Sequence, residues 1–142
     1  MDIRVVQHGS PEYEEVVNFR DEWLRKPLGL AFSEVELAAE LDQLHFAGYL
    51  NGELAACAVL QWLAPDIAKM RQVAVRADLR GRGLGSILVE FFEKEAKQRG
   101  AIRIVLHARV TTLPFYLGRG YRTTGAPFEE IGVPHQRMEK TT

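Results

Sequence analysis

Apolar residues recur with the spacing of a helix in the middle of the chain, between two stretches that have the pattern of strands. In residues 84–100 they follow one another at intervals of three and four, so that a continuous stripe would face a core. The stripe consists of Leu84, Ile87, Leu88, Phe91 and Phe92. Gly100 follows Arg99, and glycine is a common residue just past a helix end. We therefore predict a core-facing helix over residues 84–99.

Two more helices are predicted near the N-terminus, because each begins with a recognisable cap. Ser10 precedes Pro11 and a run of acidic residues, which is the preferred order at a helix start. The first helix, residues 10–24, would bury Tyr13, Val16, Val17, Trp23 and Leu24. Ser33 and Glu36 have the spacing of a capping box, followed by Leu37 and Leu41. This predicts a second, shorter helix over residues 33–43.

Strand patterns occupy most of the remaining chain. Asn51 and Gly52 join two of them, and this dipeptide is the strongest short signal for a hairpin because both central residues of a type I′ turn need a positive φ. Residues 111–120 are typical of a short helix with Pro114 in its first turn. The predicted strands are residues 3–7, 44–50, 53–63, 67–75, 101–108, 121–125 and 135–140. The resulting order is β-α-α-β-β-β-α-β-α-β-β, without a repeat or a linker.

Composition and charge agree with one soluble domain over residues 1–142. Hydrophobic residues make up 46% and charged residues 26%, which argues against a disordered or fibrous chain. A net charge of −1 argues against a dedicated nucleic-acid binder. The single cysteine, Cys57, lies in an apolar stretch and is expected to be a small buried side chain. Because neither a signal peptide nor a membrane-spanning run is recognisable, we expect a cytoplasmic protein without membrane contact, as a monomer or a homodimer.

The stretch VAVRADLRGRGLGS, Val73 to Ser86, places three glycines and three arginines between a predicted strand and a predicted helix. This succession leaves backbone N–H groups free at a helix N-terminus, where phosphate binds readily. A nucleotide P-loop is excluded because the chain contains no Gly-Lys pair. A dinucleotide fingerprint would need a glycine in place of Ser86 and an acid after the next strand, which ends near His107. The alternative is a purely structural role, in which the glycines only make a tight turn and bind no ligand.

The spacing of Arg80, Gly83 and Gly85 matches the coenzyme A turn R/Q-x-x-G-x-G/A, and here the sequence resembles the GCN5-related N-acetyltransferase (GNAT) family. FYLGRGY, residues 115–121, is similar to a second family segment, and FEEIGVPHQRMEK, residues 128–140, resembles the end of a small bacterial subgroup. The resemblance covers nearly the whole chain. It implies a single-domain α/β (α+β) fold with a mixed, mostly antiparallel sheet of six to seven strands. About four helices would flank this sheet, and its two central parallel strands would splay apart.

The resemblance also implies that acetyl-CoA is the co-substrate and that a primary amine attacks the thioester directly. No metal is expected, because His8 and His45 have no metal-ligand spacing with one another or with an acid pair. The end of the strand before the turn would pair with the pantetheine arm. Backbone N–H groups of the turn would hold the pyrophosphate. The residues expected to bind coenzyme A are Val73, Ala74, Val75, Arg80, Gly81, Arg82, Gly83, Leu84, Gly85 and Ser86.

The implied acetyl transfer includes two proton transfers, and each needs a side chain that donates or accepts the proton. Tyr116 matches the family's tyrosine near the sulfur and is expected to protonate the leaving thiolate. The sequence does not decide which residue is the general base, because the strand where many relatives carry a glutamate reads Lys-Met-Arg-Gln at residues 69–72. His135 and Glu130, in the C-terminal pattern, are the two candidates. His107 is expected to be a packed histidine.

The acceptor pocket is expected to draw on regions that form the acceptor side in relatives. The residues predicted to line it are Arg20, Trp23, Phe128 and Glu129. Arg109 stands where relatives often carry an asparagine that contacts pantetheine, so this contact is lost or replaced by an arginine that reaches toward phosphate. The expected partner is a small-molecule or peptide amine. The alternatives are a non-catalytic acyl-CoA-binding or sensing domain, suggested by the missing glutamate, and RNA contact through residues 80–83.

Overall fold

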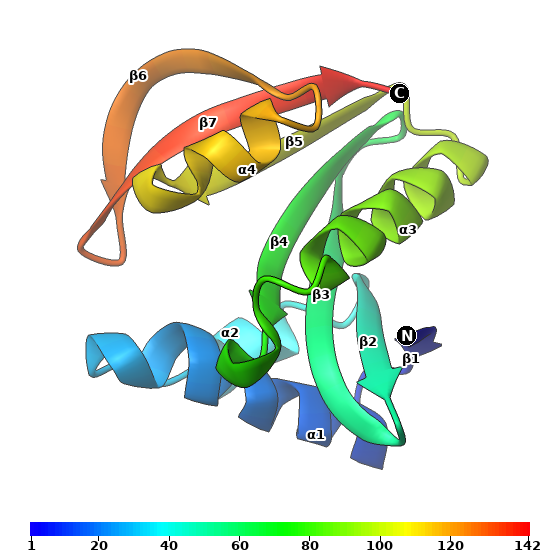
Figure 1. Cartoon of the computed structure of the whole chain (residues 1–142). Coiled ribbons are helices and arrows are strands. Elements are labelled where there is room, and N and C mark those ends of the chain that lie inside the picture. Colours follow the sequence, from blue (N-terminus) through cyan, green and yellow to red (C-terminus); the bar gives the residue numbers. More distant parts are fainter.

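One seven-stranded sheet runs through the computed structural model, which describes residues 1–142 (Figure 1). The strands are β1 (Asp2–Val6), β2 (Leu44–Leu50), β3 (Glu53–Ala64), β4 (Ile67–Val75), β5 (Arg103–Arg109), β6 (Arg122–Glu130) and β7 (Val133–Thr141). They lie in the order β1-β2-β3-β4-β5-β7-β6. Every neighbouring pair is antiparallel except β4 and β5, which are parallel. The mixed sheet expected from the sequence is confirmed.

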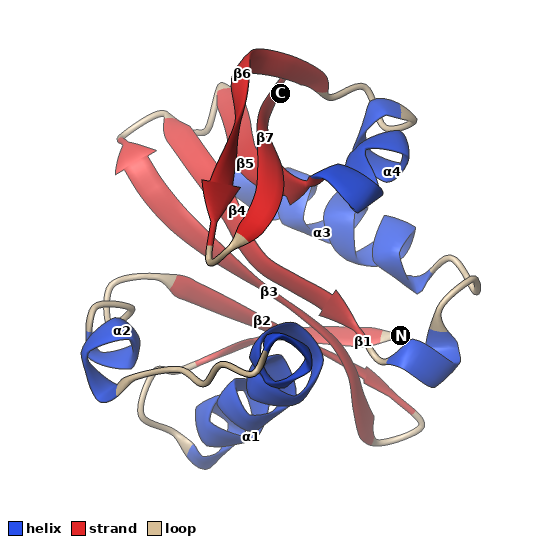
Figure 2. Ribbon diagram, turned by 90° about the vertical axis from the view of Figure 1, so that its left-hand side faces the viewer, coloured by secondary structure: helices blue, strands red, loops and turns tan.

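Helices cover both faces of this sheet. They are α1 (Pro11–Arg20), α2 (Glu34–Ala38), α3 (Leu84–Gln98) and α4 (Leu113–Leu117), and α1 continues into a π-helical turn, η1 (Asp21–Arg25). Figure 2 shows α3 and α4 on one side of the sheet and α1 and α2 on the other. None of the helices is long and apolar enough to cross a membrane.

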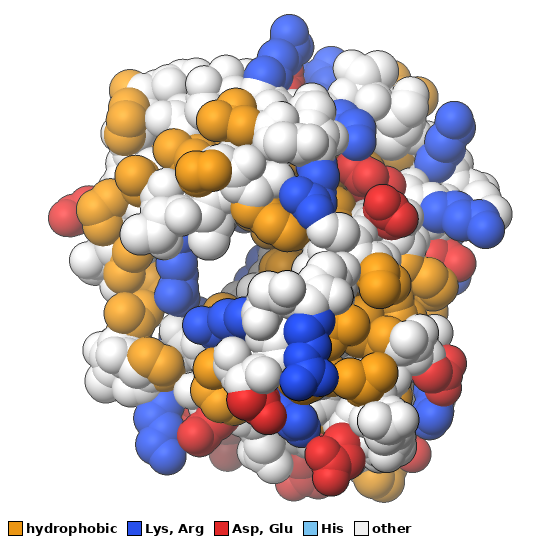
Figure 3. All heavy atoms as spheres, in the orientation of Figure 1, with side chains coloured by type: hydrophobic (Ala, Val, Ile, Leu, Met, Phe, Trp, Pro, Cys, Tyr) orange, Lys and Arg blue, Asp and Glu red, His pale blue; other side chains and the backbone are white.

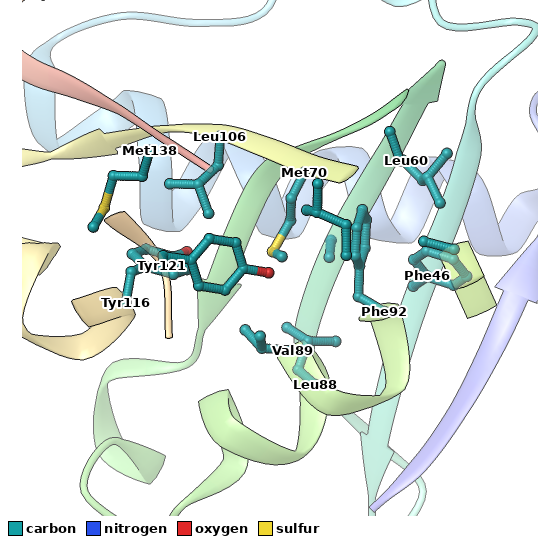
Figure 4. Packing of buried hydrophobic residues seen from close by; sticks show 14 of the residues in the cluster. Phe46, Leu60, Met70, Leu88, Val89, Phe92, Leu106, Tyr116, Tyr121 and Met138 are labelled. Carbon is teal, nitrogen blue, oxygen red and sulfur yellow. The ribbon is translucent and has the colours of Figure 1, made fainter. Parts of the chain in front are cut away.

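The larger core lies between the sheet and α3. Leu88, Val89 and Phe92 of α3 are completely buried against Phe46 of β2 and Met70 of β4 (Figure 4). A smaller core under α1 contains Val16, Phe19, Cys57 and Ala74. Burial raises the pKa of the Cys57 thiol to about 12, so this side chain is the inert apolar residue that the sequence predicts.

The local signals in the sequence act as predicted. Asn51 and Gly52 adopt φ values of 53° and 80° in the hairpin between β2 and β3. The hydroxyl of Ser10 accepts a hydrogen bond from the N–H of Tyr13 at 3.1 Å, and Ser33 and Glu36 form both bonds of a capping box. These caps fix where α1 and α2 begin.

Two predicted helix faces need correction. Ile87 is 43% exposed, because the buried stripe of α3 includes Val89 and Ala96 instead. The second helix ends at Ala38, five residues earlier than predicted, and Leu41 is 70% exposed. The chain turns after Ala38 so that Glu40 points inward to a buried arginine.

That arginine, Arg20, is the centre of a polar network beneath α1. The carboxylate of Glu40 accepts hydrogen bonds from Arg20 at 2.7 and 2.8 Å and from the hydroxyl of Tyr13 at 3.0 Å. Arg71 of β4 lies 3.5 Å from the same carboxylate. Burial raises the pKa of Glu40, but the hydrogen bonds and charge of Arg20 outweigh this effect and leave the pKa below its usual range. The network fastens α1 to β4.

Replacing Glu40→Gln should lower the free energy of unfolding near neutral pH by about 3–5 kcal/mol, because Arg20 would stay buried without a counter-charge. Since the pKa of Glu40 is lowered by folding, its stabilisation exists above the unfolded pKa and is lost as the pH falls through the folded value. The difference between wild type and variant should therefore narrow in acid. Urea unfolding at several pH values measures it. Glu22→Gln, which breaks an exposed pair with Lys26, should cost less than about 1 kcal/mol, and an equal cost for both variants would contradict the prediction.

Candidate functional site

The parallel strands β4 and β5 pair over only four residues each and then separate. Their register runs from Ile67 opposite Arg103 to Met70 opposite Leu106, whereas β4 continues to Val75 and β5 to Arg109. Between the diverging ends lies a cleft of about 750 Å³, within the range of small-molecule sites. Figure 1 shows β4 and β5 close together at the top of the view and apart further down, where β4 runs into the turn that leads to α3.

A β-bulge lies in β4 at the point where the cleft begins. The register with β3 passes from Val59 opposite Arg71 to Cys57 opposite Ala74, so that Gln72 and Val73 together oppose one residue and β4 has one extra residue. Gln72 has a φ of 54°, and the Cys57 thiol donates a hydrogen bond to its carbonyl oxygen at 3.4 Å. The extra residue reverses the alternation of the strand. Met70 therefore belongs to the core under α3, and Ala74 belongs to the core under α1.

The glycine-rich turn closes one end of the cleft. Gly81 and Gly83 have φ values of 81° and 78°, and the space where their Cβ atoms would lie is open. The N–H groups of residues 81–83 take no part in the turn hydrogen bonds, and those of residues 84–86 belong to the unpaired first turn of α3. Six N–H donors thus have no backbone hydrogen-bond partner. The guanidinium of Arg80 donates to the carbonyl oxygen of Val75 at 3.2 Å, between the turn and the strand end.

Tyr116 of α4 lies on the cleft wall and is 7% exposed. Its ring contacts those of Phe115 and Tyr121 edge to face, at centroid distances of 5.0 and 5.6 Å. Burial raises its pKa to about 12, although the charge of Arg119 opposes the rise. The hydroxyl therefore remains a proton donor throughout the neutral range.

Two histidines and a carboxylate form a cluster on the opposite side of the sheet plane. Nδ1 of His107 donates to Glu130 at 3.0 Å, and Nδ1 of His135 donates to the carbonyl oxygen of Val133 at 2.7 Å. Nε2 of His135 is therefore free to accept a proton, and it lies 3.7 Å from the second oxygen of Glu130. Burial raises the pKa of Glu130, but His107, His135 and Lys69 outweigh this effect, so that its pKa is below the usual range.

The structure brings most of the predicted site residues to this one cleft. Residues 73–75, Arg80, Leu84 and Gly85 line it together with Trp23, Tyr116, Glu130 and His135. Gly81, Arg82, Gly83 and Ser86 belong to the turn but do not line the wall. Phe128 does not line the wall, but its ring packs on those of His107 and His135 at centroid distances of 4.9 and 6.0 Å.

Arg20 was predicted to line the acceptor pocket, and this prediction is wrong. Its side chain is completely buried in the ion pair with Glu40 and contributes nothing to the cleft wall. Glu129 also lies outside the wall, because it alternates with Glu130 along β6. Arg109 donates to the carbonyl oxygen of Leu24 in η1 at 3.0 Å, so it does not reach toward the turn.

Several lining residues with ionisable side chains were not among the predicted site residues. His107 was expected to be packed, but it holds Glu130 in place. Lys69 and Arg25 also line the cleft. Nothing in their local sequence marks them, because only the pairing of distant strands and the course of η1 bring them together. No group of three or more His, Cys, Asp or Glu side chains is placed to hold a metal ion.

Comparison with known proteins identifies the family. A family model described as an acetyltransferase (GNAT) domain matches residues 14–142. The chain belongs to this family. It is therefore a GNAT N-acetyltransferase, an acyltransferase that uses acetyl-CoA.

Relatives agree with this assignment along the whole chain. The chain is 28% identical to the uncharacterized N-acetyltransferase YjcF of Bacillus subtilis over 124 residues, which cover 83% of this chain and 88% of YjcF. The crystal structure of Escherichia coli ElaA superimposes with a TM-score of 0.84 at 20% identity and covers 98% of both chains. An aminoglycoside 6′-N-acetyltransferase in complex with coenzyme A has a TM-score of 0.79 at 19% identity, and 99% of this GNAT chain and 97% of that chain are covered. Members of this fold thus include an enzyme for small-molecule amines.

Replacing Gly83→Ala should weaken the binding of coenzyme A at least about tenfold, because the new methyl group would enter the space in front of the free N–H groups. Gly29→Ala is a matched control, since Gly29 also has a positive φ, 70°, and open space around it. Both variants should lose about 1–2 kcal/mol of stability through the strained backbone. Calorimetry with coenzyme A should separate them. Equal affinities would show that the turn does not hold the ligand.

Proposed function

We propose that the enzyme transfers the acetyl group of acetyl-CoA to a primary amine by direct attack on the thioester, and that Tyr116 protonates the leaving thiolate. The observation that carries this proposal is the cleft, where the free edge of β4, Tyr116, Glu130 and His135 all meet. A ligand that passes through the split would touch the proton donor on one side and the proton acceptors on the other.

The free edge of β4 and the turn after it are suited to the two ends of the coenzyme. Val73 to Val75 have no neighbour on the β5 side, so their backbone groups can pair with the pantetheine arm as an added strand would. The N–H groups of residues 81–86, with the positive end of α3 behind them, would bind the pyrophosphate. The bound coenzyme supplies the thioester. The N–H of Val73, at the bulge, is our candidate for stabilising the oxyanion.

The acceptor must lose a proton, because a free alkyl amine has a pKa of about 10.4 and is almost entirely protonated at neutral pH. We assign this step to His135 and Glu130. Nε2 of His135 carries a lone pair, and the neighbouring carboxylate would stabilise the imidazolium that forms. His107 keeps Glu130 in position through its hydrogen bond to the other oxygen.

Tyr116 completes the reaction on the other side of the split. A thiol has a pKa of about 8.5 in water, and its thiolate becomes a stronger base in an apolar cleft. A buried phenol with a pKa of about 12 keeps its proton until such a base forms beside it. The burial of Tyr116 therefore prevents early loss of the proton.

Replacing Tyr116→Phe should lower kcat about 10²- to 10⁴-fold with little change in the affinity for acetyl-CoA, because only the proton donor is removed. Release of free thiol with a panel of amines measures kcat. Tyr121→Phe is the control, since its hydroxyl is hydrogen-bonded to Glu93 at 2.8 Å and lies away from the cleft wall. That variant should lose stability and keep its turnover. Unchanged turnover in Tyr116→Phe would remove this residue from the mechanism.

Replacing Glu130→Gln should lower kcat/KM at least about 10²-fold, and His135→Gln should do the same, because each removes a proton acceptor. Since the pKa of Glu130 is lowered, its carboxylate is charged at neutral pH, and its contribution to wild-type activity should be lost only as the pH falls into the acidic range. Initial rates across the pH range test both statements. Glu129→Gln should remain active, as its carboxylate lies outside the cleft. Full activity in both cleft variants would exclude the assigned base.

A further inference from the structure

Strand alternation divides the residues of the cleft between the two faces of the sheet. On β5, Leu106 and Ala108 belong to the core under α3, so His107 and Arg109 face the side of α1. On β4, Ala68 and Met70 belong to that same core, so Lys69 and Arg71 also face the side of α1. The α1 side is thus distinct from the side of α3 and α4, where the turn and Tyr116 lie.

The α1 side of the cleft is rich in positive charge. Four cationic side chains line it, Arg25, Lys69, Arg71 and Arg109, whereas Glu130 is the one carboxylate on the cleft wall. The remaining lining cation, Arg80, lies at the turn. Figure 3 shows the hollow of the cleft with Lys and Arg side chains around it.

Two of these four cations already have a carboxylate partner. Arg25 contacts Glu36 through both of its terminal nitrogens, at 2.8 and 3.3 Å, and Arg71 lies 3.5 Å from Glu40. Lys69 and Arg109 form no salt bridge. The hydrogen bond from Arg109 to Leu24 uses one N–H of the guanidinium and leaves the others without a protein acceptor. Burial and the nearby charge of Arg25 lower the pKa of Arg109, as expected for a cation without a counter-ion.

Arg109 also lies beside the assigned base. In the register of β5 with β7 it stands directly opposite His135, and such residues carry their side chains on one face at about 5 Å between Cβ atoms. The guanidinium of Arg109, which has no carboxylate partner, is therefore close enough to His135 and Glu130 for one small molecule to contact it while its amine lies at the base.

From this juxtaposition we propose that the acceptor is an amine that carries an anionic group, a carboxylate or a phosphate, and that Arg109 binds this group with Lys69 nearby. The inference rests on the proposed acetyl transfer and assigns the class of its acceptor. A guanidinium matches either anion with paired hydrogen bonds. Amino acids and aminoalkyl phosphates have both groups at a suitable separation, whereas a polycationic amine would meet repulsion from the same side chains.

Positive charge at this place also helps the chemistry. Neighbouring cations disfavour the ammonium form of the acceptor and lower its pKa. Glu130 alone would have the opposite effect. Arg109 and Lys69 thus shift the bound amine toward the neutral form that can attack.

The test compares acceptors that differ in the anionic group. Suitable pairs are L-phenylalanine with phenethylamine, L-lysine with cadaverine, and phosphoethanolamine with ethanolamine. We expect the anionic member of at least one pair to have a kcat/KM about 10- to 100-fold higher, which is the usual effect of a hydrogen-bonded charge pair. The amino-acid and phosphate pairs distinguish the two kinds of anion. Equal or better turnover of every member without an anion would overturn the proposal while leaving the acetyl transfer intact.

Arg109→Gln should remove this preference and raise the KM of the anionic acceptor about 10- to 100-fold, with the KM of acetyl-CoA unchanged. Arg109→Lys, which keeps the charge, should restore part of the preference. Arg99→Gln, at the exposed end of α3, is the control and should behave as wild type. A preference that survives in Arg109→Gln would exclude Arg109 as the anion site.

Calorimetry with the protein loaded with coenzyme A separates this proposal from the proposed function. If the protein acetylates no amine, the transfer hypothesis fails. Tighter binding of the anionic members that disappears in Arg109→Gln would still support the anion site. Equal binding within every pair would exclude it.

Discussion

The early end of the pairing between β4 and β5 is the constraint on which the site depends. A sheet that continued its hydrogen bonds to Val75 and Arg109 would have no free edge and no space through its middle. The chain connects β4 to β5 through α3, so that the two strands run parallel. The large core under α3 keeps their first halves in contact. Beyond Met70 and Leu106 no ladder joins them. The backbone that is left unpaired is what makes this sheet suited to an extended ligand.

The bulge at Gln72 and Val73 gives the two faces of the split different chemistry. By reversing the alternation of β4, it turns Val73 and Val75 toward the core under α3, whereas Lys69 and Arg71, which precede it, face α1. The α3 side thus receives an apolar strand end, a glycine-rich turn with free N–H groups and a phenol. The α1 side receives histidines, a carboxylate and cations. One extra residue therefore separates the proposed place of the co-substrate from the proposed place of the acceptor.

The sequence predicts the features of this molecule that are encoded locally. The hairpin at Asn51, the caps at Ser10 and Ser33 and the glycine-rich turn each depend on the conformational preferences of a few adjacent residues, and all occur where predicted. The family resemblance adds the mixed sheet and its splayed pair of parallel strands, which no local pattern determines. Apolar periodicity placed the long helix correctly but assigned Ile87 to the core, because spacing alone does not fix the rotation of a helix on its sheet.

Features that depend on distant contacts were not predictable in this way. Arg20 has the sequence context of a surface cation near Trp23, and only the fold brings Glu40 to it. In the sequence, His107 has no feature that distinguishes it from other strand residues. Only the fold brings Glu130 of β6 within hydrogen-bond distance of it. Arg109 was recognised as a departure from the family pattern, but its direction was set by η1, a π-helical turn that the sequence does not announce. The chemistry of the α1 side of the cleft thus arises almost wholly from tertiary structure.

The short ladder between β4 and β5 has one more consequence. It joins a four-stranded half of the sheet, β1 to β4, to a three-stranded half, β5 to β7, through only four residue pairs. The glycine-rich turn belongs to the first half, and Tyr116, Glu130 and His135 belong to the second. The residues proposed to bind the coenzyme and those proposed to move protons therefore lie on different halves of the sheet. The four residue pairs at the closed end of the cleft, together with the core under α3, set the distance between the two groups.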